Sequence, residues 1–120
     1  MSTQAVANRL VELCRQGDFQ TAQRELYASD AASYEPEGSP WQDVKGTEAL
    51  QEKGRQWGEM VDEFHGIEVS QPIVADPFFS VSMMMDVTMN GERSTNREIA
   101  VYELKDGKVV SERFFYPVQE

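Results

Sequence analysis

The spacing of hydrophobic residues changes from helical to alternating about halfway along the chain. Near the N-terminus the hydrophobic residues recur at intervals that place them on one side of a helix: Val6, Leu10, Leu13 and Cys14. Ser2 or Thr3 is a suitable cap for the start of this helix, and Gly17 is typical of its end. The first segment is therefore predicted to be an amphipathic helix.

Two more helices and a short strand are predicted before the pattern changes. Asp18 is a suitable cap for the second helix, which carries Phe19, Ala22 and Leu26 on one side. Segment 31–35 favours a short strand that Pro36 ends. The third helix is predicted from Gly46–Thr47 to Gly66, because its hydrophobic side keeps helical spacing over that length: Leu50, Gly54, Trp57, Met60 or Val61, and Phe64.

The second half of the chain is typical of strands. Four segments are rich in Val, Ile, Phe, Tyr and Met, and short turn sequences separate them: 67–74, 78–89, 93–104 and 108–117. Helices that precede a run of antiparallel strands indicate the α+β class. We expect residues 1–120 to form one domain, with three N-terminal helices packed on a curved, mainly antiparallel sheet.

Turn residues predict which strand positions lie opposite one another. Asn90-Gly91 favours a two-residue turn, which pairs Met83 with Glu98. Residues 105–107 favour a three-residue loop, which pairs Ala100 with Glu112 and makes Glu98 and Glu112 diagonal neighbours. One face of the predicted sheet then carries Phe79, Val81, Met83, Met85, Glu98, Ala100, Tyr102, Val110, Glu112, Phe114 and Tyr116. We expect the helices to cover this face, and the mixed opposite face to be solvated or to contact a second subunit.

Charge and composition exclude several classes of protein. The 120 residues have a net charge of −10, and the 11 Lys and Arg are scattered, so nucleic acids and membrane surfaces are poor partners. One cysteine, Cys14, and no membrane-spanning segment lead us to expect a reduced, cytoplasmic protein. There is no phosphate-binding loop, nucleophile elbow or metal-ligand cluster, and His65 is the one histidine. We expect no cofactor and no metal.

Three segments resemble the nuclear transport factor 2-like superfamily, which includes ketosteroid isomerases and SnoaL-like polyketide cyclases. They are Leu-Tyr-Ala-Ser-Asp-Ala-Ala-Ser-Tyr-Glu-Pro-Glu-Gly (26–38), Val-Lys-Gly-Thr-Glu-Ala-Leu (44–50) and Asp-Gly-Lys-Val-Val-Ser-Glu-Arg-Phe-Phe-Tyr (106–116). The resemblance implies a cystatin-like cone and is strongest to small SnoaL-like proteins of bacteria. It places Glu35, directly before Pro36, where ketosteroid isomerases have the base that transfers a proton.

The resemblance fails at the oxyanion hole of ketosteroid isomerases. The tyrosine of helix one corresponds to Leu10, and the protonated acid of the penultimate strand falls at about Ala100. Steroid isomerisation is therefore not expected of this chain. Glu112 or Tyr102 could replace the missing donors.

Glu35, Glu112 and His65 are the candidate catalytic residues. Partial burial of Glu35 would make it a general base, although a strand-end acid is commonly solvated. Glu98 and Glu112 could share a proton or form structural ion pairs with Arg97, Arg113 or a lysine. His65 could titrate near neutral pH, cap the third helix or pack on Phe64. The candidate pocket residues, most of which core packing would also explain, are Lys53, Trp57, Phe79, Met83, Met85, Glu98, Tyr102, Phe114 and Tyr116.

These residues favour one function and leave a second one open. The first is binding of a small hydrophobic or aromatic carbonyl compound in the cone of a homodimer that pairs through the sheet. Cofactor-free isomerisation, cyclisation or dehydration would follow, with Glu35 and Glu112 as acid-base groups and His65 as an auxiliary. The alternative is a non-catalytic ligand-binding or dimerisation module of the same fold.

Overall fold

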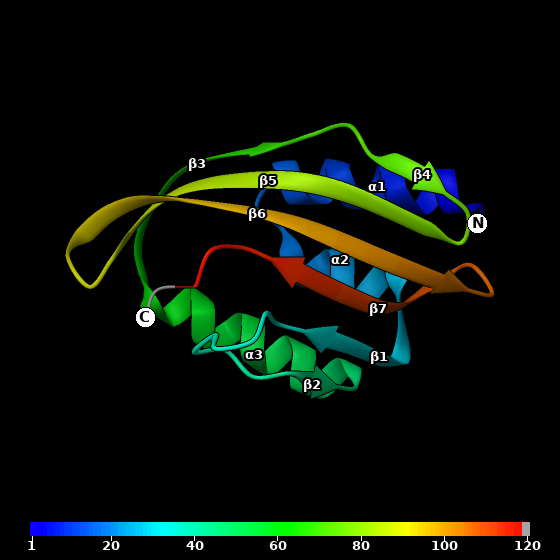
Figure 1. Cartoon of the computed structure of the whole chain (residues 1–120), viewed down its shortest axis with the longest axis horizontal. Helices are drawn as coiled ribbons and strands as arrows, with labels where there is room; N and C mark the ends of the chain where they lie inside the picture. Colours follow the sequence, from blue (N-terminus) through cyan, green and yellow to red (C-terminus); the bar gives the residue numbers. More distant parts are fainter. Residues whose placement is uncertain (119–120) are drawn as a thin grey trace.

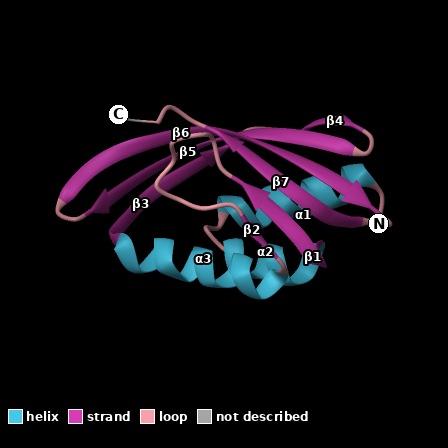
Figure 2. Ribbon diagram, turned by 60° about the horizontal axis from the view of Figure 1, so that its bottom comes forward, coloured by secondary structure: helices cyan, strands magenta, loops and turns pink. Residues whose placement is uncertain are grey.

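Three helices cover one face of a seven-stranded sheet in the computed structural model, which describes residues 1–118 (Figures 1 and 2). The α+β prediction is confirmed. The elements are α1 (Thr3–Arg15), α2 (Phe19–Leu26), β1 (Tyr27–Tyr34), β2 (Val44–Lys45), α3 (Thr47–Met60), β3 (Val61–Val69), β4 (Ile73–Ala75), β5 (Phe78–Met89), β6 (Glu92–Lys105) and β7 (Lys108–Phe115).

The first two helices begin at the predicted residues, and the first one ends just before Gly17, as predicted. The Ser2 side chain accepts a hydrogen bond from the backbone N–H of Ala5, and the Asp18 side chain accepts one from Thr21. Gly17 has a φ of +72°, so it makes the turn between α1 and α2 without steric strain. None of the helices in residues 1–118 combines the length and hydrophobicity that a membrane crossing requires.

The strand order of the sheet is β2-β1-β7-β6-β5-β3, and β4 pairs with the start of β5. Only β1 and β7 run parallel among these pairs, so the first strand lies beside the last one. This pairing brings Ser33, 79 residues away in sequence, next to Glu112. The long β5–β6 hairpin extends beyond the helices at one end of the molecule (Figure 1).

The predicted end of the third helix is wrong. Helix α3 ends at Met60, and residues 61–69 form β3, which pairs with the far end of β5. Val61 pairs with Met89 and Phe64 pairs with Val87. Valine and phenylalanine favour a strand where a partner backbone is available, and here β5 supplies it. His65 therefore lies within the sheet and does not cap a helix.

The register between β5 and β6 is confirmed, and the register between β6 and β7 is corrected. Met83 pairs with Glu98 as predicted. Asp106-Gly107 forms a two-residue turn with positive φ at both residues, like Asn90-Gly91, so Lys105 pairs with Lys108. A bulge next to this turn shifts the register by one more residue. Glu112 consequently lies opposite Tyr102, and the predicted diagonal contact between Glu98 and Glu112 is wrong.

The turn and the bulge each shift the register of β7 by one residue, and together they leave its side chains on the predicted faces of the sheet. A shift of two residues leaves each β7 side chain beyond the bulge on the predicted face. The face toward the helices is the hydrophobic core, where the buried strand residues include Phe79, Val81, Met83, Ala100 and Tyr102. The bulge itself changes one position: Val109, and not Val110, is fully buried against this core.

Candidate functional site

Glu35 is held at the end of β1 by two side chains from other parts of the chain. Lys53 on α3 donates a hydrogen bond to its Oε2 at 2.8 Å, and Tyr116, just after β7, donates one to its Oε1 at 2.6 Å. The Glu35 side chain is 7% exposed. The backbone N–H of Glu35 also donates to Asp43 at 2.7 Å, which fixes the Glu-Pro step. Both carboxylate oxygens of Glu35 are therefore oriented, and each keeps one lone pair.

Lys53 connects Glu35 to a second, fully buried carboxyl group. Its ammonium also donates to Ser33 Oγ at 2.9 Å, and Ser33 Oγ donates to Glu112 Oε2 at 2.8 Å. Tyr27 donates to the other oxygen of Glu112. These contacts form a continuous network: Tyr27, Glu112, Ser33, Lys53, Glu35, Tyr116 and Ser39, whose Oγ lies 2.6 Å from the Tyr116 hydroxyl.

The surroundings of Glu112 have opposite effects on the ionisation of its carboxyl group. Burial raises the pKa of the Glu112 carboxyl, while the hydrogen bonds from Tyr27 and Ser33 and the charge of Lys53 act in the opposite direction. Glu112 is 4% exposed. In this arrangement both carboxyl oxygens of Glu112 are hydrogen-bonded within the network.

Glu98 lies on the same face of the sheet and differs from the other two acids. Burial raises the pKa of the Glu98 carboxyl to about 7, and the negative charges of Glu35 and Glu112 add to this effect. Within residues 1–118, no hydrogen bond or ion pair holds the Glu98 side chain. A carboxyl group with this pKa can give or take a proton near neutral pH.

The positions of the two donors found in ketosteroid isomerases are part of the hydrophobic core. Leu10 is 1% exposed and Ala100 is fully buried. Tyr102, the proposed replacement, is also buried, and its ring stacks on Phe79 at 4.7 Å between centroids. Among the pocket candidates, Phe79 and Tyr102 are therefore core residues.

His65 does not belong to the network. Its Nε2 lies 2.7 Å from Thr88 Oγ1 on β5, and Glu63 is 3.8 Å away. Because Val87 points to the core, Thr88 points to the opposite face of the sheet. The structure thus separates His65 from Glu35 and Glu112 by the sheet itself.

The remaining pocket candidates lie on the helix-covered side of the sheet. Lys53 is 6.0 Å from the centre of the Phe114 ring, and Trp57 makes an edge contact with Phe19 at 6.3 Å. Met83 is buried, while Met85 is partly exposed. Within residues 1–118, no group of three or more His, Cys, Asp or Glu is arranged to hold a metal ion.

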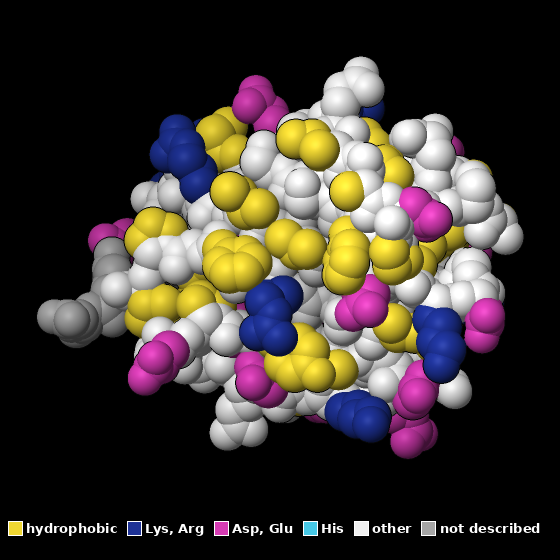
Figure 3. All heavy atoms as spheres, turned by 45° about the vertical axis from the view of Figure 1, so that its right-hand side comes forward, with side chains coloured by type: hydrophobic (Ala, Val, Ile, Leu, Met, Phe, Trp, Pro, Cys, Tyr) yellow, Lys and Arg dark blue, Asp and Glu magenta, His cyan; other side chains and the backbone are white. Residues whose placement is uncertain are grey.

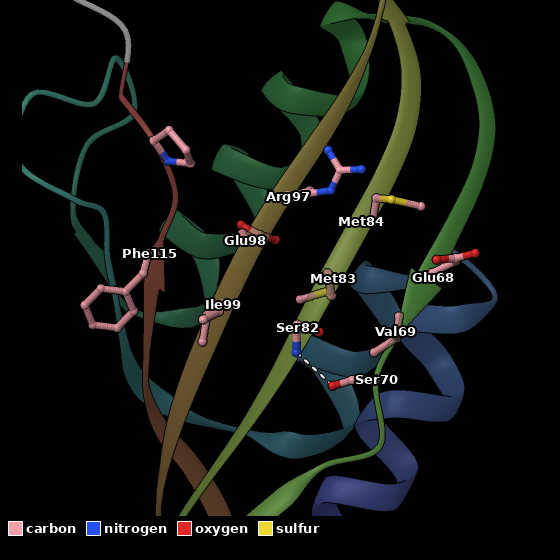
Figure 4. Close-up of a pocket in the computed structure, with 11 residues that line it drawn as sticks. Glu68, Val69, Ser70, Ser82, Met83, Met84, Arg97, Glu98, Ile99 and Phe115 are labelled. Carbon is pink, nitrogen blue, oxygen red and sulfur yellow. Dashed lines mark hydrogen bonds between the residues drawn. The ribbon is translucent and has the colours of Figure 1, made fainter.

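An open hollow of about 700 Å³ lies on the other side of the sheet (Figure 4). The helices lie behind the sheet in this view. Alternation along the strands places most of its lining side chains on the outer face, including Ser82, Met84, Arg97, Ile99 and Phe115. No residue of the Glu35–Lys53–Glu112 network lines the hollow, but Glu98 does, together with Val69 and Met83.

The comparison with protein families assigns the chain to one of them. The family model of the SnoaL-like domain matches residues 1–116. The chain belongs to the SnoaL-like family. The search among curated proteins found no significant match.

Solved structures with the same fold agree with this assignment. A suspected SnoaL-like polyketide cyclase from Mesorhizobium loti is 38% identical, with a TM-score of 0.90, over 97% of this chain and all of that chain. A cystatin-like protein of unknown function from Xanthomonas campestris has a TM-score of 0.82 at 15% identity, over 97% and 91% of the two chains. TerC, co-crystallised with polyporic acid, has a TM-score of 0.76 at 14% identity, over 97% and 92%. The predicted cystatin-like fold is confirmed.

The sequence identified part of the network and missed the rest. Glu35, Lys53, Glu112 and Tyr116 were all candidates, and the structure brings the four together. Tyr27, Ser33 and Ser39 were not candidates. A signal for Ser33 existed, because it is two residues before Glu35 on the predicted strand and therefore lies on the same face.

Proposed function

We propose that this SnoaL-like protein binds a small hydrophobic or aromatic carbonyl compound next to Glu35 and catalyses a cofactor-free proton transfer of the isomerase, cyclase or dehydratase type. The observation that carries the proposal is a pair of unlike acids on one face of the sheet. Lys53 and Tyr116 orient the carboxylate of Glu35, while burial gives the neighbouring Glu98 a pKa of about 7.

The two acids take different parts in the proposed reaction. Glu35 accepts a proton from the carbon next to the carbonyl group, because its remaining lone pairs are free and Lys53 stabilises its charge. Glu98 donates its proton to the oxygen or the leaving group, because burial keeps this proton bound up to about neutral pH. Glu112 takes no part as an acid or base in this proposal. It holds Ser33, which in turn holds Lys53.

The relatives support this class of substrate. The structure from Mesorhizobium loti is described as that of a suspected polyketide cyclase, and TerC was co-crystallised with polyporic acid. The proposal extends these descriptions to a carbonyl compound of the same general kind. It names no particular substrate.

Hydrogen exchange with solvent tests the proposed proton transfer. A panel of aromatic and polycyclic ketones is incubated with the protein in deuterated water, and deuterium uptake next to the carbonyl group is followed by mass spectrometry. We expect Glu35→Gln to slow uptake about a hundredfold, since it removes the base and keeps the shape. The matched control is Glu37→Gln, an exposed acid two residues further on, which is expected to exchange like the wild type.

The pH dependence of exchange tests the part of Glu98. Because the Glu98 proton is lost as the pH rises through about 7, exchange should decline above that pH. Glu98→Gln should lower the maximal rate and remove this decline. Equal exchange in the wild type, Glu35→Gln and Glu98→Gln would contradict the proposed catalysis.

A non-catalytic binding module is the second candidate function. It is favoured by the core positions of Leu10 and Ala100, which leave no hydrogen-bond donor where ketosteroid isomerases have theirs. In that case a ketone from the panel would bind, as seen by native mass spectrometry, and no deuterium would enter it. Binding with exchange supports the enzyme, and binding without exchange supports the module.

We also propose that two copies pair through the outer face of the sheet. Ile99 and Phe115 are about half exposed there, at 52% and 49%, and they are direct neighbours on β6 and β7. Half-exposed hydrophobic residues on an open sheet face are typical of a subunit contact.

A cytoplasmic location is part of the proposal, and it is supported by a single, buried cysteine, Cys14.

A further inference from the structure

We propose that Lys53 polarises the carbonyl group of the substrate and stabilises the negative charge that forms on its oxygen. This inference rests on the proposed function and adds to it the group that replaces an oxyanion hole. Removal of a proton next to a carbonyl group leaves an enolate, and an enzyme must stabilise the charge on its oxygen. Leu10 and Ala100 cannot do so, because both side chains are hydrophobic and buried.

The hydrogen bonds of Lys53 leave one position for a substrate oxygen. The ammonium donates three bonds: to Glu35 at 2.8 Å, to Ser33 at 2.9 Å and to the backbone carbonyl of Gln42 at 3.3 Å. The bond to Gln42 is the longest of the three, and its acceptor lies in an exposed loop. A substrate carbonyl oxygen that replaces the Gln42 oxygen would lie next to both Lys53 and the base.

The buried Tyr27–Glu112–Ser33 unit keeps Lys53 in place. The Ser33 hydroxyl uses its one hydrogen to donate a hydrogen bond to Glu112, so its oxygen accepts the hydrogen bond from Lys53. Tyr27 fixes the other oxygen of Glu112. Ser33 and Glu112 are therefore positioning residues for Lys53, and this role accounts for a carboxyl group in the core, where burial alone is unfavourable.

Lys53 stabilises the enolate more than the ketone because of its partnership with Glu35. In the step, the C–H bond breaks and Glu35 takes the proton, while the electron pair forms a C=C bond and moves the negative charge to the oxygen. Glu35 becomes neutral at the moment that the substrate becomes negative. The charge of Lys53 then acts on the enolate, with no movement of the side chain, which is the condition for stabilising a transition state.

Binding of 4-nitrophenol tests this charge without any reaction. Its phenolate resembles an enolate and absorbs visible light, so the pKa of the bound phenol is read by titrating the absorbance of the complex. The variant Glu35→Gln is used because glutamine resembles the protonated base. We expect the pKa of bound 4-nitrophenol to be at least about one unit lower in Glu35→Gln than in Glu35→Gln/Lys53→Gln, a tenfold preference for phenolate.

The controls separate charge, position and folding. Glu35→Gln/Lys45→Gln removes an exposed lysine and should behave like Glu35→Gln. Adding Lys53→Arg should keep most of the preference, and adding Ser33→Ala should lose much of it, because the charge remains but its anchor is gone. Thermal unfolding of each variant is recorded in parallel. If the variant with Lys53→Gln does not fold, the variants with Ser33→Ala and Lys53→Arg show whether Lys53 stabilises the bound phenolate.

Three results would overturn the assignment of Lys53. They are no binding of 4-nitrophenol to Glu35→Gln at millimolar concentration, the same phenol pKa with and without Lys53, and the same phenol pKa with and without Ser33.

Deuterium exchange distinguishes this failure from failure of the proposed function. If exchange depends on Glu35, Lys53→Gln should lower kcat about a hundredfold with a smaller change in KM. If deuterium exchange requires Glu35 but is unaffected by Lys53→Gln, the proposed role of Lys53 is refuted and the proposed proton transfer by Glu35 is not. Exchange that is absent in the wild type, together with a Lys53-dependent phenolate preference, would refute the catalysis and retain the oxyanion site.

Discussion

At the scale of single residues, Glu98 has an environment that conflicts with its charge. Its carboxyl group lies on the core-facing side of β6, where burial and two neighbouring acids raise its pKa from 4.5 to about 7. The unfolded chain has no such environment. The difference between the two states makes the free energy of unfolding depend on pH.

The pH dependence of stability is the prediction for Glu98. Between about pH 4.5 and 7 the unfolded chain loses this proton and the folded chain keeps it, so stability falls as the pH rises. Above pH 7 the loss is complete and amounts to about 3 kcal/mol. Glu98→Gln should match the wild type at pH 4 and be more stable at pH 8 by up to that amount. Urea unfolding at both pH values measures the difference.

The control for this prediction is another glutamate on the same strand. Glu103 is exposed, so Glu103→Gln should keep the stability difference of the wild type between the two pH values. Glu112, whose pKa is also raised by burial, is present in all three proteins and contributes the same background. A Glu98→Gln variant with the pH dependence of the wild type would show that Glu98 is well solvated in the folded protein.

At the scale of elements, local sequence predicted the helix starts and the Asn90-Gly91 turn correctly, whereas it missed the end of α3 and the register of β6 with β7. Ser2, Asp18 and Asn90-Gly91 act within a few residues, so their effects can be inferred from neighbours in sequence. The end of α3 could not be inferred in this way. Residues 61–64 continue the helical spacing, and only pairing with β5 makes them a strand.

The candidate site shows the same division. Glu35 was identified from the resemblance of its Glu-Pro step to ketosteroid isomerases, Lys53 from its place one turn before Trp57, and Glu112 from its face of the predicted sheet. Their hydrogen bonds depend on the parallel pairing of β1 with β7, which no local pattern specifies. Tyr27 was missed for this reason: its partner Glu112 is 85 residues away in sequence.

Two glycines of α3 lead to a prediction about the contact between helices. Gly58 has open space around it, whereas a methyl group on Gly54 would lie 3.0 Å from Nε2 of Gln20 on α2. Alanine favours a helix over glycine by about 1 kcal/mol. Gly58→Ala should therefore raise the free energy of unfolding by about that amount. Gly54→Ala should gain less, because its methyl group displaces Gln20 from its bond to the Gln51 carbonyl oxygen.

Thermal unfolding of the two alanine variants measures this difference, and each serves as the control for the other. An equal gain at both positions would mean that the Gln20 side chain moves away from Gly54 at no cost, and that its hydrogen bond to the Gln51 carbonyl oxygen adds little to stability.

At the scale of the whole molecule, the outer face of the sheet is the large surface that no helix covers (Figure 2). Figure 3 shows hydrophobic side chains in a broken band across one face of the molecule, with Lys, Arg, Asp and Glu side chains around and between them. Such a mixed surface is typical of a contact between subunits and differs from the continuous positive stripe that nucleic acids require.

The oligomeric state is the prediction at this scale. A stable pair needs about 800 Å² from each copy, so the contact must extend over several strands and include Ile99 near the middle of β6. We expect light scattering at micromolar concentration to give the mass of two chains for the wild type and of one chain for Ile99→Lys, since a lysine there would lose its hydration without gaining a partner. Met60→Lys changes a similarly exposed hydrophobic residue on α3 and should remain a dimer. A wild type that has the mass of one chain, or an Ile99→Lys variant that still pairs, would place the contact elsewhere or remove it.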